Sequence, residues 1–384
     1  MFRKVRQEIP SLYAVLADIP DPRRAQGRRH PLGVMLSLAC VALLSGRQTV
    51  LGIAEWAADY GESYLEWFQR GWRCPPSQAT WYRVLRAVDW QELEARVHKW
   101  VQQVLGVLAE PGALRGMAID GKTLRGSRKQ GAANAHLLSA VGHQLGMTLI
   151  QVAVSDKTNE IGALEDLLRR LVIEGQVVTI GALLTQRHVA QAPVERKADY
   201  VFLVRDNQPS LCQDLQLLFT TPPPRTRNDT WPEACSCDLA HGRIEVRQLQ
   251  ATTALNDYLD WPGVAQVFRL VRQRHLKRSG SVTVETTYGV TSLPPQRASA
   301  AQLLALTRLH WTIENRSHWA RDVAFDEDRA QTRRGRLPHV MATLRNLTIT
   351  LLRANGLQHI ARARRRFAAR PEEALHLLGL PASE

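Results

Sequence analysis

Hydrophobic residues in the first hundred positions recur at helical spacing and include one continuous apolar stretch. That stretch, Leu32 to Gly46, has 15 residues, whereas a membrane-spanning helix needs about 20. We therefore interpret it as a helix buried in the core of a folded domain. The pattern predicts helices at Leu32–Leu44, Val50–Ala58, Tyr64–Trp67, Pro76–Arg86 (with Ser77 as N-cap) and Trp90–Val107.

Short apolar runs separated by turn residues replace the helical spacing after Glu110-Pro111-Gly112, which we take as a domain boundary. Strands are predicted at Leu114–Asp120, Ala135–Val141, Met147–Val154, Val177–Leu184 and Asp199–Val204, and helices at Ile161–Leu171 and Gln186–Arg196. Strands first, followed by alternating helices and strands, predict an α/β sheet that begins with antiparallel hairpins. This order fits an RNase H-like core, and it fits other α/β folds as well.

The pattern changes again after the break at Pro222-Pro223-Pro224. Strands are predicted within Ala234–Thr252, Val267–His275 and Val282–Leu293, and long helices at Ala298 to about Ala320 and at Leu337–Ala354. The sequence thus predicts a helical N-terminal domain over residues 1–110, an α/β domain over 113–355 with a β-rich insertion at about 221–295, and a tail over 356–384.

Charge points to the class of partner. The chain holds 50 Lys and Arg against 36 Asp and Glu, a formal net charge of +14. Such an excess favours a polyanionic partner, most simply nucleic acid, and arginine-rich codon usage alone does not account for it. Five scattered cysteines do not suit a secreted disulfide framework. We expect a cytoplasmic protein that does not enter the membrane.

Basic residues gather in three places. The Pro- and Arg-rich segment Ile19–Pro31 predicts an extended basic loop, and the short helix after Ser77 resembles the recognition helix of a helix-turn-helix. The tail helix from Gln358 to Arg370 suits phosphates, although a solvated helix face explains it equally well. The candidate DNA contacts in the loop and the short helix are Arg23, Arg24, Arg28, Arg29, Arg83 and Arg86.

Two acidic residues are candidates for chemistry. Asp120 ends a predicted strand beside a glycine, where a carboxylate can bind a divalent cation, although a turn Asp before Gly is the commoner role. Glu314 lies between His310 and His318 at spacings of four, which places all three on one face of a helix. That stripe is either a metal site or three ordinary helix residues.

These segments resemble the transposases of the H-repeat-associated group of bacterial insertion sequences (the ISAs group, Asp-Asp-Glu class). The resemblance runs from about Ile19 to Leu352. Its motifs are Asp21-Pro22-Arg23-Arg24, Pro76-Ser77, Ile119-Asp120-Gly121-Lys122-Thr123-Leu124-Arg125-Gly126-Ser127, His136-Leu137-Leu138-Ser139-Ala140, Asp156-Lys157-Thr158-Asn159-Glu160-Ile161, Tyr200-Val201-Phe202, Asn207-Gln208-Pro209, His241-Gly242-Arg243-Ile244-Glu245, His310-Trp311-Thr312-Ile313-Glu314-Asn315 and Asp322-Val323-Ala324-Phe325-Asp326-Glu327-Asp328.

The resemblance implies an RNase H-like domain with a β-rich insertion, a helical DNA-binding N-terminus and two Mg²⁺ (or Mn²⁺) ions held by three carboxylates. Asp120 matches the first carboxylate and Glu314 the third, and we expect them to face one another. The second carboxylate is replaced by Gly181, which offers no ligand; Asp156 or Glu160 could instead approach the site. Lys122, Arg125 and His310 are expected to contact DNA.

The resemblance and the missing carboxylate together set the functional expectation. We predict a transposase that binds the terminal repeats of its element on double-stranded DNA as a homodimer in the nucleoid, with impaired metal-dependent strand cleavage and transfer. The alternative is a non-catalytic DNA-binding protein derived from a transposase. A general RNase H-like nuclease is the weaker third possibility.

Overall fold

The protein is described by a computed structural model, whose described residues are 9–64, 68, 74–108, 114–127, 134–154, 160–222, 231–240 and 242–380. By its contacts the chain forms two compact units. Unit 1 comprises Met1–Ala113, Gly121–Asn159 and Ile313–Glu384, and unit 2 comprises Leu114–Asp120 and Glu160–Thr312. The predicted boundary at Glu110–Gly112, Trp67 of the predicted helix Tyr64–Trp67, and Pro223-Pro224 lie outside the described residues.

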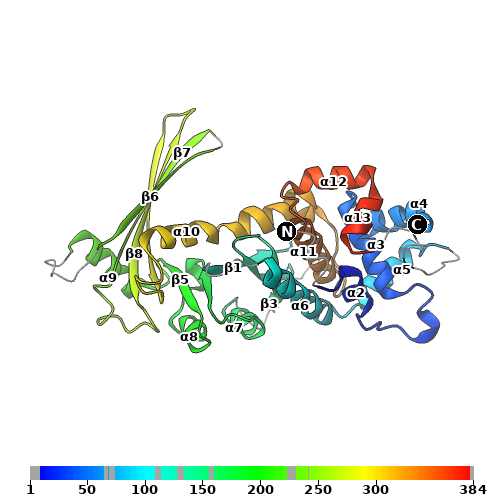
Figure 1. The fold of residues 1–384 in the computed structure, drawn as a ribbon, viewed down its shortest axis with the longest axis horizontal. Coiled ribbons are helices and arrows are strands. Elements are labelled where there is room, and N and C mark those ends of the chain that lie inside the picture. Colours follow the sequence, from blue (N-terminus) through cyan, green and yellow to red (C-terminus); the bar gives the residue numbers. More distant parts are fainter. Residues whose placement is uncertain are drawn as a thin grey trace. The chain divides into compact units, whose positions relative to one another are not determined.

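Unit 1 is built around one apolar helix. Helix α3 (Leu32–Leu44) begins and ends as predicted, and all of its residues are buried, as expected of a helix that is apolar on every side. The helices packed against it come from both ends of the chain: α2 (Leu12–Ala17), α4 (Val50–Tyr64), α11 (Leu337–Ala354), α12 (Ile360–Ala369) and α13 (Pro371–Leu377). Figure 1 shows this cluster of blue and red helices. None of the helices in the described ranges is long and apolar enough to cross a membrane.

A further helix of unit 1 is α6 (Trp90–Leu108), which contacts α2 of this cluster. It packs on α11 and on strand β3 (Thr148–Val154), which pairs antiparallel with β2 (His136–Gly142). The predicted cap of α5 (Gln78–Ala87) is confirmed, because the Ser77 side chain accepts a hydrogen bond from the Thr80 backbone NH. The short 3-10 turns of unit 1 are η1 (Ala25–Gly27), η3 (Arg125–Ser127) and η7 (Glu327–Arg329).

Unit 2 is a mixed sheet covered by helices. Its parallel strands are β1 (Arg115–Thr123, whose last residues belong to unit 1), β4 (Gln176–Ile180) and β5 (Asp199–Val204). Antiparallel strands β9 (Val282–Thr291), β8 (Gln266–Leu276), β7 (Arg243–Thr252) and β6 (Glu233–Ala240) continue the sheet from β5. The full strand order is β3-β2-β1-β4-β5-β9-β8-β7-β6. The predicted mixed α/β architecture is therefore confirmed.

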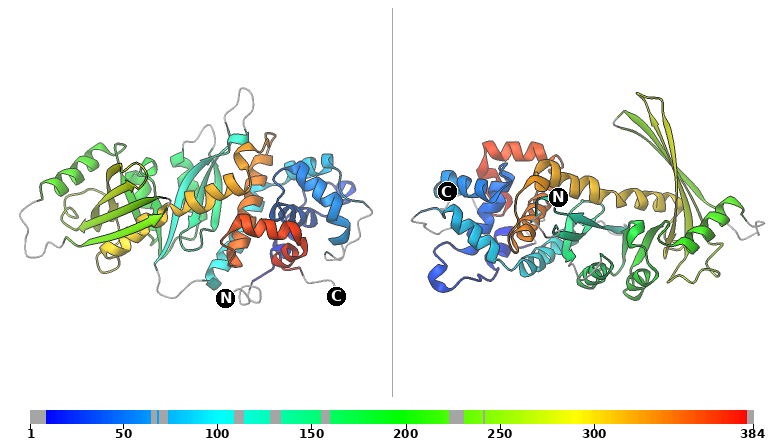
Figure 2. Two further views of the ribbon diagram at one scale, coloured as in Figure 1. Left: turned by 90° about the horizontal axis from the view of Figure 1, so that it is seen from above. Right: turned by 180° about the vertical axis from the view of Figure 1, so that it is seen from behind.

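Helix α10 (Ala300–His310) lies along one face of this sheet, while α7 (Glu160–Arg170) and α8 (Arg187–Glu195) lie on the other face (Figures 1 and 2). A capping box fixes the start of α10, where Ser299 and Gln302 each bond to the backbone of the other. Its apolar side packs on Val177, Val201 and Phe268 in the core of unit 2. Helix α9 (Pro209–Thr220), which the sequence pattern did not reveal, packs on β8 and β9.

Two predicted elements were wrong in their extent. The strand expected over Val177–Leu184 ends at Ile180, and a 3-10 turn, η4 (Ala182–Leu184), follows. The single helix expected from Ala298 to Ala320 ends at His310, and two stretches of π-helix, η5 (Ile313–His318) and η6 (Ala320–Ala324), follow Trp311. A π-helix closes its hydrogen bonds over five residues instead of four. Within this stretch the Glu314 side chain is exposed whereas His318 is buried, so the two residues do not share one environment.

Candidate functional site

The carboxyl ends of β1 and β4 bring two of the predicted site positions together in unit 2. These neighbouring parallel strands pair Ile119 with Ile180, so that Asp120 and Gly181 follow at the same edge of the sheet. Ala118 pairs with Thr179, and side chains two residues apart share a face. Asp120, which is half-buried, therefore lies on the same face of the sheet as Thr179.

Gly181 has an ordinary backbone conformation. Its φ of −72° and ψ of 163° belong to the extended region that any L-residue can adopt. A Cβ atom placed on Gly181 would lie 3.7 Å from Nε2 of His310, an ordinary van der Waals contact. Apart from the chain neighbours, no second atom of the described residues lies within 4 Å of that position. The backbone therefore has room for a side chain here.

His310, the last residue of α10, lies against the end of β4. Its Nδ1 is 3.1 Å from the hydroxyl oxygen of Thr179, and that hydroxyl also bonds the carbonyl oxygen of Met117 at 3.1 Å. The imidazole is buried, with 8% of its surface exposed. Burial lowers the pKa of His310 to about 4, and a hydrogen bond to the backbone of Thr179 offsets part of that change. The side chain is therefore neutral at pH 7.

Glu314 belongs to unit 1, where its π-helical segment is held by buried charges. The Glu314 side chain is exposed. Two residues further on, the carbonyl of Arg316 accepts a hydrogen bond from the Arg353 guanidinium. Lys122 bonds both carboxylate oxygens of Asp322 at 2.7 Å. These contacts fix the backbone around Glu314 while leaving its carboxylate in solvent.

A buried cluster of three ions anchors the end of the same segment. Glu327 pairs with Arg321 at 2.7 Å and with Arg345 at 3.1 Å, and no more than 2% of any of the three side chains is exposed. Burial raises the pKa of Glu327, but the charges of the two arginines outweigh that effect, so the pKa is lowered overall. Glu327 is therefore ionised at neutral pH.

The predicted stripe of His310, Glu314 and His318 is not a metal centre. Within the described part of the chain there is no group of three or more His, Cys, Asp or Glu residues arranged to hold a metal ion. His318 is buried, and its pKa is lowered to about 3 by burial and by the nearby charges of Arg321 and Lys122. Of the alternative carboxylates, Glu160 is the first residue of α7 and Asp156 lies outside the described residues.

The predicted DNA contacts of the N-terminal region differ in exposure. Arg23 is largely buried and bonded to Asp21, so it shapes the basic loop. The other predicted arginines of the loop and of α5 are exposed: Arg24, Arg28, Arg29, Arg83 and Arg86. Lys122 is buried and paired, whereas 77% of the Arg125 side chain is exposed.

The tail helix α12 is partly a structural element. Arg364 is buried, bonds the carbonyl oxygens of Leu43 and Arg47, and stacks 4.3 Å from the ring centre of Phe325. Arg362, Arg365 and Arg366 remain exposed on the opposite side of the helix. The exposed arginines of α12 can therefore form either a solvated face or a phosphate-binding face. Arg364 belongs to neither, because it is buried.

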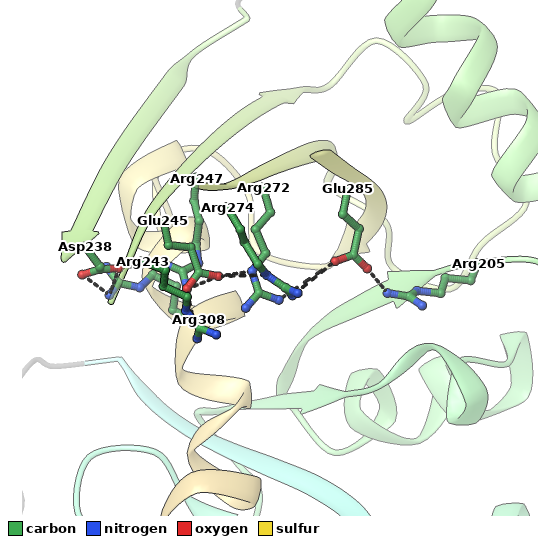
Figure 3. Close-up of polar contacts among 9 residues, drawn as sticks. All are labelled: Arg205, Asp238, Arg243, Glu245, Arg247, Arg272, Arg274, Glu285 and Arg308. Atoms are coloured by element: carbon green, nitrogen blue, oxygen red, sulfur yellow. Dashed lines mark hydrogen bonds and ion pairs between the residues drawn. The ribbon is translucent and has the colours of Figure 1, made fainter. Parts of the chain in front are cut away.

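An arginine face on the β-rich insertion was not recognised in the sequence (Figure 3). It gathers six arginines and three acids: Arg205, Arg243, Arg247, Arg272, Arg274, Arg308, Asp238, Glu245 and Glu285. Six positive against three negative charges leave an excess of three. Alternation along β7 places Arg243, Glu245 and Arg247 on one face, and the register of β7 with β8 sets Arg272 and Arg274 beside them. The other four residues come from β6, from β9, from the segment after β5 and from α10. The alternating charges of Arg243, Glu245 and Arg247 are the sequence signal that could have revealed it.

Comparison with known proteins identifies the family. The sequence matches the family described as transposase DDE domain over residues 84–351 and the domain associated with it over residues 13–101. YncI of Escherichia coli O157:H7, named as a candidate transposase, is 29% identical over 357 residues, which cover 90% of this chain and 88% of YncI. YhhI of E. coli (strain K12), named as a candidate H repeat-associated transposase, is 27% identical over 363 residues, which cover 90% of this chain and 91% of YhhI.

A solved structure of the piggyBac transposase synaptic complex with hairpin DNA aligns with 98% of this chain and 77% of that chain, at a TM-score of 0.42 and 11% identity. The family is identified from the sequence matches. The match to the DDE domain alone covers about seven tenths of the chain. On these matches, the chain belongs to the transposase DDE domain family, among relatives of the H repeat-associated transposases.

Proposed function

We propose that this protein is an insertion-sequence transposase of the Asp-Asp-Glu class that binds the ends of its element but cleaves them poorly with Mg²⁺. The observation that carries the proposal is the register of β1 and β4, which sets Asp120 beside Gly181 at one edge of the sheet. In the family motif these are the positions of the first two carboxylates. The site thus retains one acid of that pair and lacks the other.

The architecture supports the catalytic part of the proposal. An antiparallel pair β2-β3 followed by parallel strands β1, β4 and β5 is the order expected of an RNase H-like core. In such a core, bound divalent ions would activate the attacking oxygen and stabilise the leaving oxygen at phosphate. In the family motif Asp120 has the position of the first carboxylate and Glu314 that of the third, but Gly181 contributes no ligand, so the side chains do not fit the family's full set.

DNA binding is the other part of the proposal. We place the backbone contacts on exposed arginines, because Lys122 and His310 are buried and have partners within the protein. The N-terminal helices and the arginine face are the proposed DNA-binding surfaces, acting in a homodimer on paired ends in the bacterial nucleoid. A non-catalytic DNA-binding protein is the second candidate function, favoured by the absence of a carboxylate at Gly181.

One pair of assays separates these candidates. The full-length protein is incubated with duplexes that carry the element's terminal repeats or a scrambled sequence, and binding and strand cleavage are measured with Mg²⁺ or Mn²⁺. We expect preferential binding to the repeats and little cleavage with Mg²⁺. Equal binding to both duplexes would contradict the transposase proposal, and no cleavage with either ion would favour the non-catalytic protein.

The first DNA-binding prediction concerns α5. Arg83→Ala combined with Arg86→Ala is expected to weaken binding to duplex DNA and to reduce the slope of log affinity against log salt by about two units, one for each phosphate contact. The measurement is a fluorescence anisotropy titration at several salt concentrations. Arg169→Ala combined with Arg170→Ala, on exposed positions of α7, is the matched control. An unchanged slope in the α5 variant would remove this helix from the interface.

The second DNA-binding prediction concerns the arginine face. Arg205 and Arg308 are its most exposed cations, with 55% and 39% of their side chains accessible. Replacing both by alanine is expected to reduce the salt slope by about two units as well. Arg187→Ala, which also breaks an exposed ion pair in unit 2, controls for loss of charge. If the double variant and the control behave alike, the arginine face only stabilises the β-rich insertion.

A further inference from the structure

A cavity in unit 1 lies beside the π-helical segment that carries Glu314. Its walls come from η5 and η6, the end of α11 and the start of α12, and η6 packs on both helices (Figure 1). The cavity has a volume of about 410 Å³, within the range of about 300–1,000 Å³ that is usual for sites of small ligands. Its lining begins at Asn315, the residue after Glu314.

The charged side chains that line this cavity are cationic. Among the described residues of the lining there are four arginines and no acid: Arg316, Arg353, Arg362 and Arg365. Arg362 and Arg365 are exposed on α12. Arg366, the next residue along the helix, is not part of the lining and pairs with Glu373. The cavity therefore favours an anionic ligand.

One of these arginines is buried with an unused donor. Only 4% of Arg353 is exposed, and its Nε has no hydrogen-bond partner among the described residues. A buried donor without a partner costs free energy. Burial and the nearby charge of Arg316 also lower the pKa of Arg353 to about 10. An anion in the cavity would offset the repulsion between these two cations.

The start of α12 adds backbone donors to the same cavity. The first N–H groups of a helix have no partner within the helix. In α12 the side chain of the N-cap residue His359 does not cap them, and the first turn holds no acidic residue. His359, Ile360 and Ala361 all line the cavity. A helix N-terminus next to arginines is well suited to a phosphate group.

The rest of the lining includes exposed apolar surface. Trp319 is 61% exposed and Val323 is 58% exposed, and both line the cavity. An indole ring beside arginines suits a nucleotide, because the ring stacks on the base while the cations hold the backbone. A base inside a duplex is already stacked on its neighbours, so only an unpaired base can offer its face to Trp319.

Resting on the proposed function, we propose that this cavity holds one unpaired nucleotide of a DNA strand. Its base stacks on Trp319, and its phosphate is held by Arg362, Arg365 and the start of α12. Because the lining begins one residue after Glu314, the nucleotide lies next to the third acidic position of the family motif. Single-stranded DNA thus becomes a partner of this chain in addition to the duplex.

Replacement of Trp319 tests the stacking. Fluorescence anisotropy measures binding of the full-length protein to a short labelled oligothymidine and to a duplex of the same length. Trp319→Ala is expected to weaken binding to the single strand about tenfold, as for the loss of one stacked base, and to leave duplex binding unchanged. Trp319→Phe, which keeps an aromatic face, should restore most of the affinity. Tyr258→Ala removes an aromatic side chain that is 67% exposed in unit 2 and serves as the control.

Two neighbouring arginines test the phosphate contact independently of Trp319. Arg365→Ala is expected to reduce the slope of log affinity against log salt for the single strand by about 0.7. Arg366→Ala removes the same charge one residue away and should leave the slope unchanged.

Three results would overturn the proposal: no loss of single-strand binding in Trp319→Ala, an equal loss for single strand and duplex, or equal behaviour of Arg365→Ala and Arg366→Ala. Binding of free thymidine monophosphate as tightly as the oligothymidine would also overturn it, by assigning the cavity to a soluble ligand. Preference for duplex terminal repeats over a scrambled duplex reports separately on the proposed function, so the failure of one is distinguishable from the failure of the other.

Discussion

Gly181→Asp is expected to turn a protein that binds its ends without efficient cutting into one that cleaves them with Mg²⁺. The rate should rise by about 10³-fold, equivalent to about 4 kcal/mol of transition-state stabilisation, because the carboxylate restores a ligand that positions the metal ions. The backbone at residue 181 already has an extended conformation, and its Cβ would meet His310 at ordinary contact distance. Single-turnover cleavage of a terminal-repeat duplex measures the effect.

Two variants separate charge from size in this experiment. Gly181→Asn has nearly the same shape as the aspartate variant but no negative charge, and it should remain as slow as the unmodified protein. Gly181→Ala reports the effect of a Cβ alone. Robust Mg²⁺-dependent cleavage by the unmodified protein, lost in Asp156→Ala or Glu160→Ala, would instead show that another carboxylate has taken over the role.

Removal of the buried charge at Glu327 is expected to have the largest effect on stability. Glu327→Gln leaves Arg321 and Arg345 buried without their counter-ion, which typically costs about 3–5 kcal/mol. Urea unfolding at pH 7 measures the loss. Glu372→Gln, a partly exposed position in the first turn of α13, is the control and should change stability by less than about 0.5 kcal/mol. A loss below 1 kcal/mol in Glu327→Gln would contradict the anchoring role of this cluster.

We also expect the difference in stability between the unmodified protein and Glu327→Gln to depend on pH. The folded state lowers the pKa of Glu327 below its usual 4.5, so the stabilisation from its charge is complete above that pH and is lost as the pH falls through the folded pKa. The difference in stability between the unmodified protein and Glu327→Gln should be constant from pH 7 to about 5 and should shrink at lower pH. Glu94 has a buried carboxyl with a raised pKa, so its contribution to stability changes with pH in the opposite direction. Because Glu94 is present in both proteins, that contribution cancels when their stabilities are subtracted.

Local pattern was sufficient for much of the fold. Helices Leu32–Leu44 and Leu337–Ala354 and strand Asp199–Val204 begin and end where the spacing of apolar residues placed them. In each case nearly every residue of the element is buried, so the sequence pattern and the packing agree. The register that sets Asp120 beside Gly181 also follows from two parallel strands being neighbours.

The errors lie where distant residues determine the local structure. The π-helix around Glu314 is held by Lys122 and Arg353, which are far away in sequence and invisible to helical periodicity. From the sequence we expected Lys122 to contact DNA, whereas in the structure it is buried and paired with Asp322. The orientation of His310 likewise depends on a chain of hydrogen bonds through Thr179 to Met117. That chain exists only once α10 has packed on the sheet.

The extended backbone at Gly181 has a genetic consequence. Glycine and aspartate codons ending in a pyrimidine differ at one base, and no compensating change in the surrounding chain is required, because the φ of −72° already accommodates a side chain. Where the Gly181 codon ends in a pyrimidine, one nucleotide substitution therefore places an aspartate at this position.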